Sequence, residues 1–195
     1  MAGRDESGLH RGAFGRFGLE SSALALLAAA GAMWLAAAGP ARAEYPPTTL
    51  QTLLDRAQIE DLLVEYYGNL GGADRGFGSY YTADGVLDVN GIVAHGPKGI
   101  EDLYKRVAEG TPRPRGTFHM LLTNPHIVVN GDTATADVIW TGIESDTPKA
   151  RPHFVEQGRE HDELVKQNGR WYIKHRVITS DGGLPAMFEK TYKKR

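Results

Sequence analysis

Proton transfer near neutral pH is one chemistry that this sequence could support, since it contains seven histidines and no cysteine. Histidine changes its charge between pH 5 and 8, so it serves as a general base or acid. His119 lies in a largely apolar run at residues 117–122. On a strand it would share one face with Thr117 and Leu121. It is either a base in a pocket or a hydrogen-bonded core residue, and the residues alone leave both interpretations open.

Two carboxyl groups could act beside such an imidazole, because a carboxylate fixes its tautomer and stabilises the imidazolium that forms. Asp74 follows a glycine pair, and its alternative role is to cap a helix, which Asp favours. Glu160 would share one strand face with Gly158 and Asp162. A buried Glu160 needs a cation, and Arg176 on the next predicted strand is the natural candidate. A purely structural pair between Glu160 and Arg176 is the alternative.

Aromatic and large apolar side chains are a third group of candidates. Tyr66 and Tyr67 are adjacent on a predicted helix, so one of them is expected to face a cavity squarely. A phenol can donate a hydrogen bond to an oxygen on which charge develops, although aromatic residues on an apolar helix face commonly belong to the core. The same two interpretations apply to a possible aromatic wall made of Phe77, Tyr80, Tyr81, Met120 and Trp140.

Composition and motif spacing argue against several other functions. The chain has 195 residues, with 22 Lys and Arg against 24 Asp and Glu, which gives no basic excess for binding nucleic acid. The absence of cysteine excludes disulfides, thiolate zinc sites and cysteine nucleophiles. No histidine spacing typical of metal sites, no phosphate-binding glycine loop and no serine nucleophile motif occurs. We therefore expect neither a metal nor a cofactor.

The first 43 residues have the features of an export signal. Arginines in residues 1–20 precede an uncharged, alanine-rich run at residues 21–41, and small residues at Ala41 and Ala43 suit cleavage before Glu44. We expect a periplasmic or secreted protein. The alternative is a retained membrane anchor, for which alanine is a weak inserter. The remaining residues, 44–195, are predicted to form one domain.

The periodicity of this domain predicts helices first and long strands afterwards. Apolar residues at helical spacing predict helices at residues 48–70 and 99–109. Alternating or β-branched runs then predict strands at residues 86–89, 117–122, 127–129, 133–143, 154–167 and 171–178. Helices packed on one face of a curved antiparallel sheet make an α+β fold. Such a sheet encloses a cone.

Several stretches resemble the SnoaL-like branch of the nuclear transport factor 2-like superfamily. They are residues 56–62, the turn at 83–86, the strand of His119, and residues 158–163 and 168–176. The resemblance covers residues 50–181 and implies a cone-shaped α+β barrel. It leaves the reaction open, because the same cone hosts dehydratases, dehydrochlorinases, isomerases, cyclases and non-catalytic proteins.

The dehydratases of this family imply specific roles for residues here. The resemblance makes His119 the cavity base and puts Tyr66 and Arg176 beside it. The family's orienting Asp falls on Gly71, so Asp74 or Glu160 would have to replace it. The expected substrate contacts are Tyr67, Tyr81, Met120, Trp140 and Glu160.

We therefore predict a cofactor-independent lyase that acts on a small, largely apolar, aromatic or cyclic hydroxylated molecule. The alternatives are a non-catalytic binding module of the same fold, or an isomerase or cyclase that uses the same base. The family resemblance also implies a homodimer or homotrimer.

Overall fold

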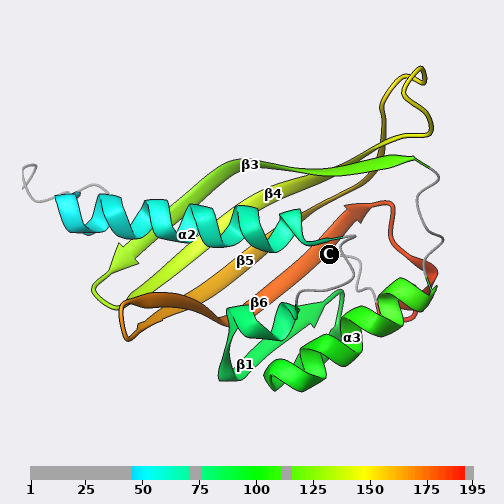
Figure 1. Cartoon of the computed structure of the whole chain (residues 1–195). Coiled ribbons are helices and arrows are strands. Elements are labelled where there is room, and N and C mark those ends of the chain that lie inside the picture. Colours follow the sequence, from blue (N-terminus) through cyan, green and yellow to red (C-terminus); the bar gives the residue numbers. More distant parts are fainter. Residues whose placement is uncertain (1–44, 71–75, 111–115, 192–195) are drawn as a thin grey trace, which may run out of the picture. The chain divides into compact units, whose positions relative to one another are not determined.

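A computed structural model describes residues 45–70, 76–110 and 116–191 (Figure 1). The elements are α2 (Leu50–Gly68), η1 (Phe77–Tyr80), β1 (Tyr81–Val89), β2 (Ile92–His95), α3 (Gly96–Gly110), β3 (Thr117–Asn130), β4 (Thr133–Ser145), β5 (His153–Gln167), β6 (Arg170–Gly182) and η2 (Ala186–Phe188). The predicted leader at 1–43, and the candidates Gly71 and Asp74, lie outside these residues. No helix in the described ranges is long and apolar enough to cross a membrane.

The six strands form one sheet in the order β2-β1-β6-β5-β4-β3. All neighbouring strands run antiparallel except β1 and β6, which are parallel. Helix α2 lies across one face of the curved sheet, and α3 lies beside β1 (Figure 1). The predicted α+β fold with a curved sheet packed against helices is confirmed. The sheet is open, and it contains one parallel pair that the prediction of an antiparallel sheet did not include.

Helix α2 owes its position to a cap and an apolar stripe. Thr49 caps it, because the Thr49 hydroxyl accepts a hydrogen bond from the Thr52 backbone N–H, while the Thr52 hydroxyl accepts one from the Thr49 backbone N–H. Ile59, Leu63 and Tyr66 follow at spacings of four and three and are fully or almost fully buried. We call the face of the sheet that receives this stripe the inner face, and the opposite one the outer face.

The inner face carries the core of the sheet. Ala136, Val138 and Trp140 of β4 are buried there, and so are Glu160 and Asp162 of β5. Strand alternation sends the intervening residues to the outer face. Two buried carboxyl groups on the inner face break an otherwise apolar pattern, so they require partners within the core.

Strand β3 is continuous where two separate strands, 117–122 and 127–129, were predicted. Its pairing with β4 shifts between Thr123 and His126, and Asn124 there has φ 51°. Because of this irregularity, even-numbered residues point inward before it and odd-numbered residues point inward after it. Met120, before the irregularity, is partly buried against the core, and Ile127, after it, is buried.

Tight turns at Asn-Gly pairs join several strands. Asn168 and Gly169 have φ of 52° and 79°, as a two-residue hairpin requires, and they connect β5 to β6 as predicted. Asn90 and Gly91, with φ of 52° and 86°, make the same connection between β1 and β2. That hairpin was not predicted, since β2 is only four residues long and shows little alternation. The turn predicted at residues 83–85 lies within β1, where pairing with β6 is irregular.

Candidate functional site

The inner face holds a buried group of charged side chains, here called the acid–arginine cluster: Glu160, Asp162 and Arg176. Asp162 on β5 stands directly opposite Arg176 on β6, and Glu160 lies two residues along β5 on the same face. Arg176 and Asp162 have no exposed surface, and Glu160 is 3% exposed. Because an unpaired charge away from water has a high free-energy cost, these buried groups must be paired with one another.

Arg176 is paired much more closely with Asp162 than with Glu160. Its Nε lies 2.6 Å from Asp162 Oδ1 and its Nη2 lies 2.9 Å from Oδ2, a bidentate pair. Arg176 Nη2 lies 3.5 Å from Glu160 Oε1. The guanidinium carbon also sits 4.0 Å from the centre of the Tyr66 ring, a cation–π contact from α2.

Two carboxyl groups thus share one cation, and the cluster would carry a net negative charge if both were ionised. Burial, opposed by Arg176 and supported by the charge of Asp162, raises the pKa of Glu160 to about 8. Burial works against the charge of Arg176, but Asp162 and Glu160 raise the pKa of its guanidinium above the usual value. At pH 7 Asp162 and Arg176 therefore form the ion pair, and Glu160 is mostly protonated.

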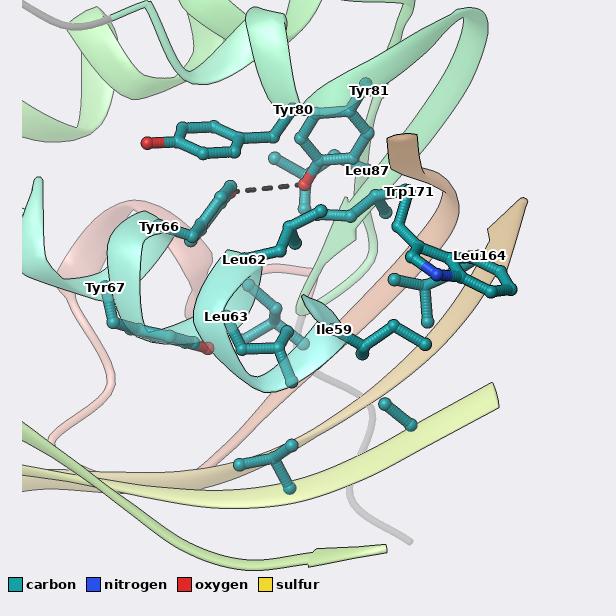
Figure 2. Close-up of a cluster of buried hydrophobic side chains, with 14 of the residues drawn as sticks. Ile59, Leu62, Leu63, Tyr66, Tyr67, Tyr80, Tyr81, Leu87, Leu164 and Trp171 are labelled. Atoms are coloured by element: carbon teal, nitrogen blue, oxygen red, sulfur yellow. Dashed lines mark hydrogen bonds between the residues drawn. The ribbon is translucent and has the colours of Figure 1, made fainter. Parts of the chain in front are cut away.

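Tyrosines of α2, β1 and α3 surround the cluster. The Tyr67 hydroxyl donates a hydrogen bond to Glu160 Oε2. The Tyr66 hydroxyl lies 3.2 Å from that of Tyr81 (Figure 2). It also shares a hydrogen bond with the hydroxyl of Tyr104. Burial raises the pKa of all four phenols well above the usual range, so they remain neutral donors at physiological pH.

Three buried polar atoms near this cluster have no hydrogen-bond partner among the described residues. They are Trp140 Nε1, Glu160 Oε1 and Arg176 Nη1. Buried polar groups in native proteins are nearly always paired, and those left unpaired mark a bound water, a ligand or a catalytic role. The cluster and the neighbouring indole therefore leave two donors and one acceptor without hydrogen-bond partners among the described residues.

A profile of the SnoaL-like domain matches residues 51–177. The chain belongs to this SnoaL-like family. The matched range contains every member of the acid–arginine cluster and the tyrosines around it. None of the curated proteins matches this sequence.

Several solved structures are similar in fold to this SnoaL-like chain. A putative scytalone dehydratase from Novosphingobium aromaticivorans is 16% identical with a TM-score of 0.54, over 67% of this chain and 87% of the other. LinA is 20% identical with a TM-score of 0.57, over 68% and 90%. A variant of Rv3472, a protein of unknown function from Mycobacterium tuberculosis, is 23% identical with a TM-score of 0.57, over 67% and 74%. Likenesses at such identities show the fold alone.

The SnoaL-like fold brings most of the predicted site residues together. Glu160 and Arg176 are in contact, as their expected pairing requires, although Asp162 is the stronger partner because it lies opposite Arg176. The remaining predicted residues on or facing this part of the inner face are Tyr66, Tyr67, Tyr81, Trp140 and, partly buried, Met120. Asp74 lies outside the described residues.

His119 is the exception, and its predicted place inside the cone is wrong. Its side chain is exposed on the outer face, opposite Ile143 of β4, because its neighbour Met120 takes the inward position. No hydrogen bond or ion pair joins His119 to another described residue. A carboxylate partner for it is therefore missing from the described part of the chain.

A histidine and carboxylate pair does occur, but on the outer face. His161 Nδ1 lies 2.7 Å from Asp137 Oδ1, and His126 Nδ1 lies 3.9 Å from Asp137 Oδ2. All three are about half exposed, beside a groove of about 320 Å³. The described residues include no group of three or more side chains placed to hold a metal ion. The pair is separated by the sheet from the buried cluster.

Two members of the buried site were not assigned by the sequence. Asp162 could have been found, since strand alternation already put it on the face of Glu160. Tyr104 could not have been found, because its hydrogen bond to Tyr66 depends on how α3 packs against the rest of the fold.

Proposed function

We propose that this SnoaL-like domain is a cofactor-independent lyase that uses Glu160 to transfer protons. Its substrate would be a small, largely apolar, cyclic and hydroxylated molecule, and the reaction a dehydration or a related elimination. One observation carries the proposal: Glu160 is a buried carboxyl group with a pKa raised to about 8 and an oxygen that lacks a hydrogen-bond partner among the described residues. The similar fold of a putative scytalone dehydratase supports this reaction class.

A carboxyl group of this kind can serve as base and then as acid. Proton-transfer catalysts work best when their pKa lies near the working pH. Ionised Glu160 would take a proton from carbon, and the C–H electron pair would form the new double bond while the C–O bond breaks. Glu160 would then return its proton to the departing hydroxyl, which leaves as water. Both proton transfers balance, so the carboxylate is regenerated without another reactant.

The side chains around Glu160 are compatible with both its ionised and its protonated carboxyl group. Tyr67 donates to its Oε2 and can hold the carboxyl in one orientation. Asp162 binds Arg176 through both oxygens and so prevents Arg176 from fully neutralising Glu160. Replacing that arrangement by a tight Glu160–Arg176 pair would lower the pKa of Glu160 and weaken it as a base.

Turnover of a Glu160→Gln variant tests the assignment. The purified protein would be incubated with a library of hydroxylated aromatic and other cyclic compounds, with mass spectrometry detecting loss of water or another small group. For any substrate found, we expect Glu160→Gln to lower kcat by about 100-fold or more while the protein stays folded. The rate should rise as the pH approaches 8, because ionised Glu160 is the base.

His119→Ala is the matched control, since it removes a titratable group from the outer face. It should keep turnover within about twofold. If His119→Ala abolishes turnover and Glu160→Gln retains it, the base is His119 and the assignment of Glu160 is wrong.

A non-catalytic binding module is the second candidate. The observation that favours it is the absence of any imidazole from the acid–arginine cluster as far as the described residues show. Saturable binding of library compounds without chemical change in any of them would support this function instead. An isomerase or cyclase would use the same proton transfer and would be recognised by a product of unchanged mass.

We also propose that residues 1–43 direct export, that cleavage precedes Glu44, and that the domain assembles as a homodimer or homotrimer. N-terminal sequencing of the protein recovered from the periplasm or medium tests the first two points. A retained leader in the membrane fraction would contradict them. Sedimentation of the purified domain tests the third, which a monomer would contradict.

A further inference from the structure

The two edges of the sheet differ in how they are protected. Strand β2 forms one edge, is only four residues long and leads directly into α3, which packs against both β2 and β1. Strand β3 forms the other edge along 14 residues (Figure 1). Proteins blunt a sheet edge with a short strand, a covering helix or charged side chains, because an open edge pairs with other chains. The β2 edge is therefore closed by its shortness and by α3.

The β3 edge has neither charge nor a neighbouring strand. None of the 14 residues of β3 is Asp, Glu, Lys or Arg. Beyond its pairing with β4, no backbone hydrogen bond from the described residues reaches β3. Alternate N–H and C=O groups of an antiparallel strand point away from its partner strand. A row of these groups along β3 therefore has no backbone partner in the described part of the chain.

Irregular backbone limits the open edge to residues 117–123. The pairing with β4 shifts between Thr123 and His126. Asn124 has φ 51° there, and Pro125 has no N–H to donate to a neighbouring strand. Beyond this point, the ring of Tyr45 lies against that of His126, with 5.6 Å between the centroids. Residues 117–123, which span about 24 Å, remain available for pairing.

This open segment is complementary to a second copy of itself. In an antiparallel pair centred on Met120, the facing residues would be Thr117 with Thr123, Phe118 with Leu122, and His119 with Leu121. Even-numbered residues of this segment point inward and odd-numbered residues outward, so each pair joins residues of the same face. Leu121, which is 45% exposed, would gain a neighbour on the outer face. Both faces of the sheet would thus continue across the junction.

We propose that this chain forms a twofold-symmetric homodimer through antiparallel pairing of residues 117–123 of β3 with the same residues of a second copy. The pairing joins two six-stranded sheets into one sheet, whose remaining edges are the two β2 strands. Both of these edges are short and covered by α3, so the dimer keeps no long open edge. A peptide from another protein would instead bring an open edge of its own, so a second copy is the occupant that closes the sheet.

The pairing also selects one of the two assemblies proposed above. Identical edges related by a twofold axis close after two copies, whereas a trimer needs two different surfaces on each copy. The dimer does not depend on the lyase assignment, because the junction involves the edge of the sheet and leaves the acid–arginine cluster within each copy.

Sedimentation of the protein purified after expression of the full chain tests the assembly. The junction is a small interface, so we expect a monomer–dimer equilibrium with a dissociation constant on the order of micromolar. Leu121→Lys should raise this constant at least about tenfold, because lysine on an edge strand opposes pairing and each junction would contain two. Leu54→Lys is the matched control, since Leu54 is 52% exposed on α2 rather than on the sheet edge, and it should leave the dimer intact.

Cross-linking tests the register, since the chain has no cysteine of its own. Met120→Cys would put the two thiols of the dimer opposite each other, at a Cβ separation of about 5 Å, close to what a disulfide bridges. We expect mild oxidation to link this variant into a dimer. Thr123→Cys alone should not be linked, because centred pairing puts its two thiols about 20 Å apart, whereas a mixture of Thr117→Cys and Thr123→Cys should be.

Several results would overturn the inference. They are a monomer at every concentration up to about 100 μM, a trimer, a dimer that Leu121→Lys leaves intact, and equal cross-linking of Met120→Cys and Thr123→Cys. The cross-linking comparison decides the matter even if Leu121→Lys fails to fold. Neither measurement needs a substrate: a monomer with turnover would remove the dimer alone, and a cross-linked dimer without turnover of any library compound would remove the lyase alone.

Discussion

Helix α2 lies over two buried carboxylate sites that differ in how completely they are paired. Near its beginning, Asp55 is 3% exposed and its two oxygens accept from Lys166 at 2.6 Å, from Gln51 at 3.1 Å and from Trp171 at 3.2 Å. Near its end, the acid–arginine cluster leaves a guanidinium nitrogen and a carboxyl oxygen without hydrogen-bond partners among the described residues, the oxygen lying 3.5 Å from Arg176 Nη2. A saturated site joins elements together, whereas an unsaturated one has capacity left for a ligand.

The two sites also differ in the direction of their pKa shifts. Burial by itself would raise the pKa of Asp55, but the hydrogen bonds from Lys166, Gln51 and Trp171 outweigh it and lower the pKa. Burial dominates at Glu160 and raises its pKa to about 8. Asp55 therefore stabilises the fold as a carboxylate, while Glu160 has the raised pKa that the proposed proton transfer requires. Two carboxyl groups with the same 3% exposure thus differ in the direction of their pKa shifts because their partners differ.

Removing Arg176 should have the largest effect on stability. Arg176→Met leaves Asp162 buried without a cation, which typically costs about 3 to 5 kcal/mol. Urea unfolding at pH 7 measures the loss. The double variant Arg176→Met with Asp162→Leu removes both charges and should recover most of the stability. A single variant that loses less than about 1 kcal/mol would show that Asp162 does not depend on this pair.

Asp55→Ala should cost somewhat less, about 3 kcal/mol, because it removes three hydrogen bonds but leaves Lys166 able to reach solvent. Urea unfolding at pH 7 again gives the value. Because the pKa of Asp55 is lowered on folding, its stabilisation is present above its unfolded value of 3.8 and is lost as the pH falls through the folded pKa.

The comparison of the two sites becomes sharper if Asp55→Ala is tested for turnover as well. The variant should turn over any library compound found to be a substrate as the unmodified protein does, since Asp55 contacts β5 and β6 through Lys166 and Trp171, at the far end of α2 from the acid–arginine cluster. A loss of turnover that matches the loss of stability would mean that the saturated site also shapes the other one.

Much of this fold follows from local patterns in the sequence. The spacing of leucines and tyrosines predicts α2 within two residues at either end, and alternation predicts that Glu160 and Asp162 share a face. The contact between Glu160 and Arg176 follows from their places on adjacent strands. These features depend on residues close in sequence or on neighbouring strands, where the period of the element decides the geometry.

The orientation of His119 could not be predicted from local sequence patterns. Alternation shows that His119 and Met120 point in opposite directions, but apolar residues occur on both faces of β3, and Leu121 is 45% exposed. The family resemblance put His119 inward, and only the packing of Met120 against the core decides otherwise. The preference of Arg176 for Asp162 likewise depends on the register of β5 and β6, which the pattern of side chains does not specify to the residue.

The smallest expected effect is a difference in how stability depends on pH. The folded pKa of Glu160 is about 8, above its ordinary value of 4.5, so the native state binds the proton more tightly and the stability that Glu160 contributes falls as the pH rises from 4.5 to 8. Glu160→Gln removes this titration. Between pH 5 and pH 6.5, the variant should therefore gain roughly 2 kcal/mol of stability relative to the unmodified protein.

Urea unfolding of both proteins at pH 5 and at pH 6.5 measures this difference, and other titrating groups cancel because they are common to the two. Glu163→Gln, an exposed carboxyl on the same strand, should show the same pH dependence as the unmodified protein. If the difference in free energy of unfolding between Glu160→Gln and the unmodified protein is the same at pH 5 and at pH 6.5, the folded pKa of Glu160 is not raised to about 8. Glu160 would then resemble Asp55, a carboxylate already paired, and the contrast between the two sites would disappear.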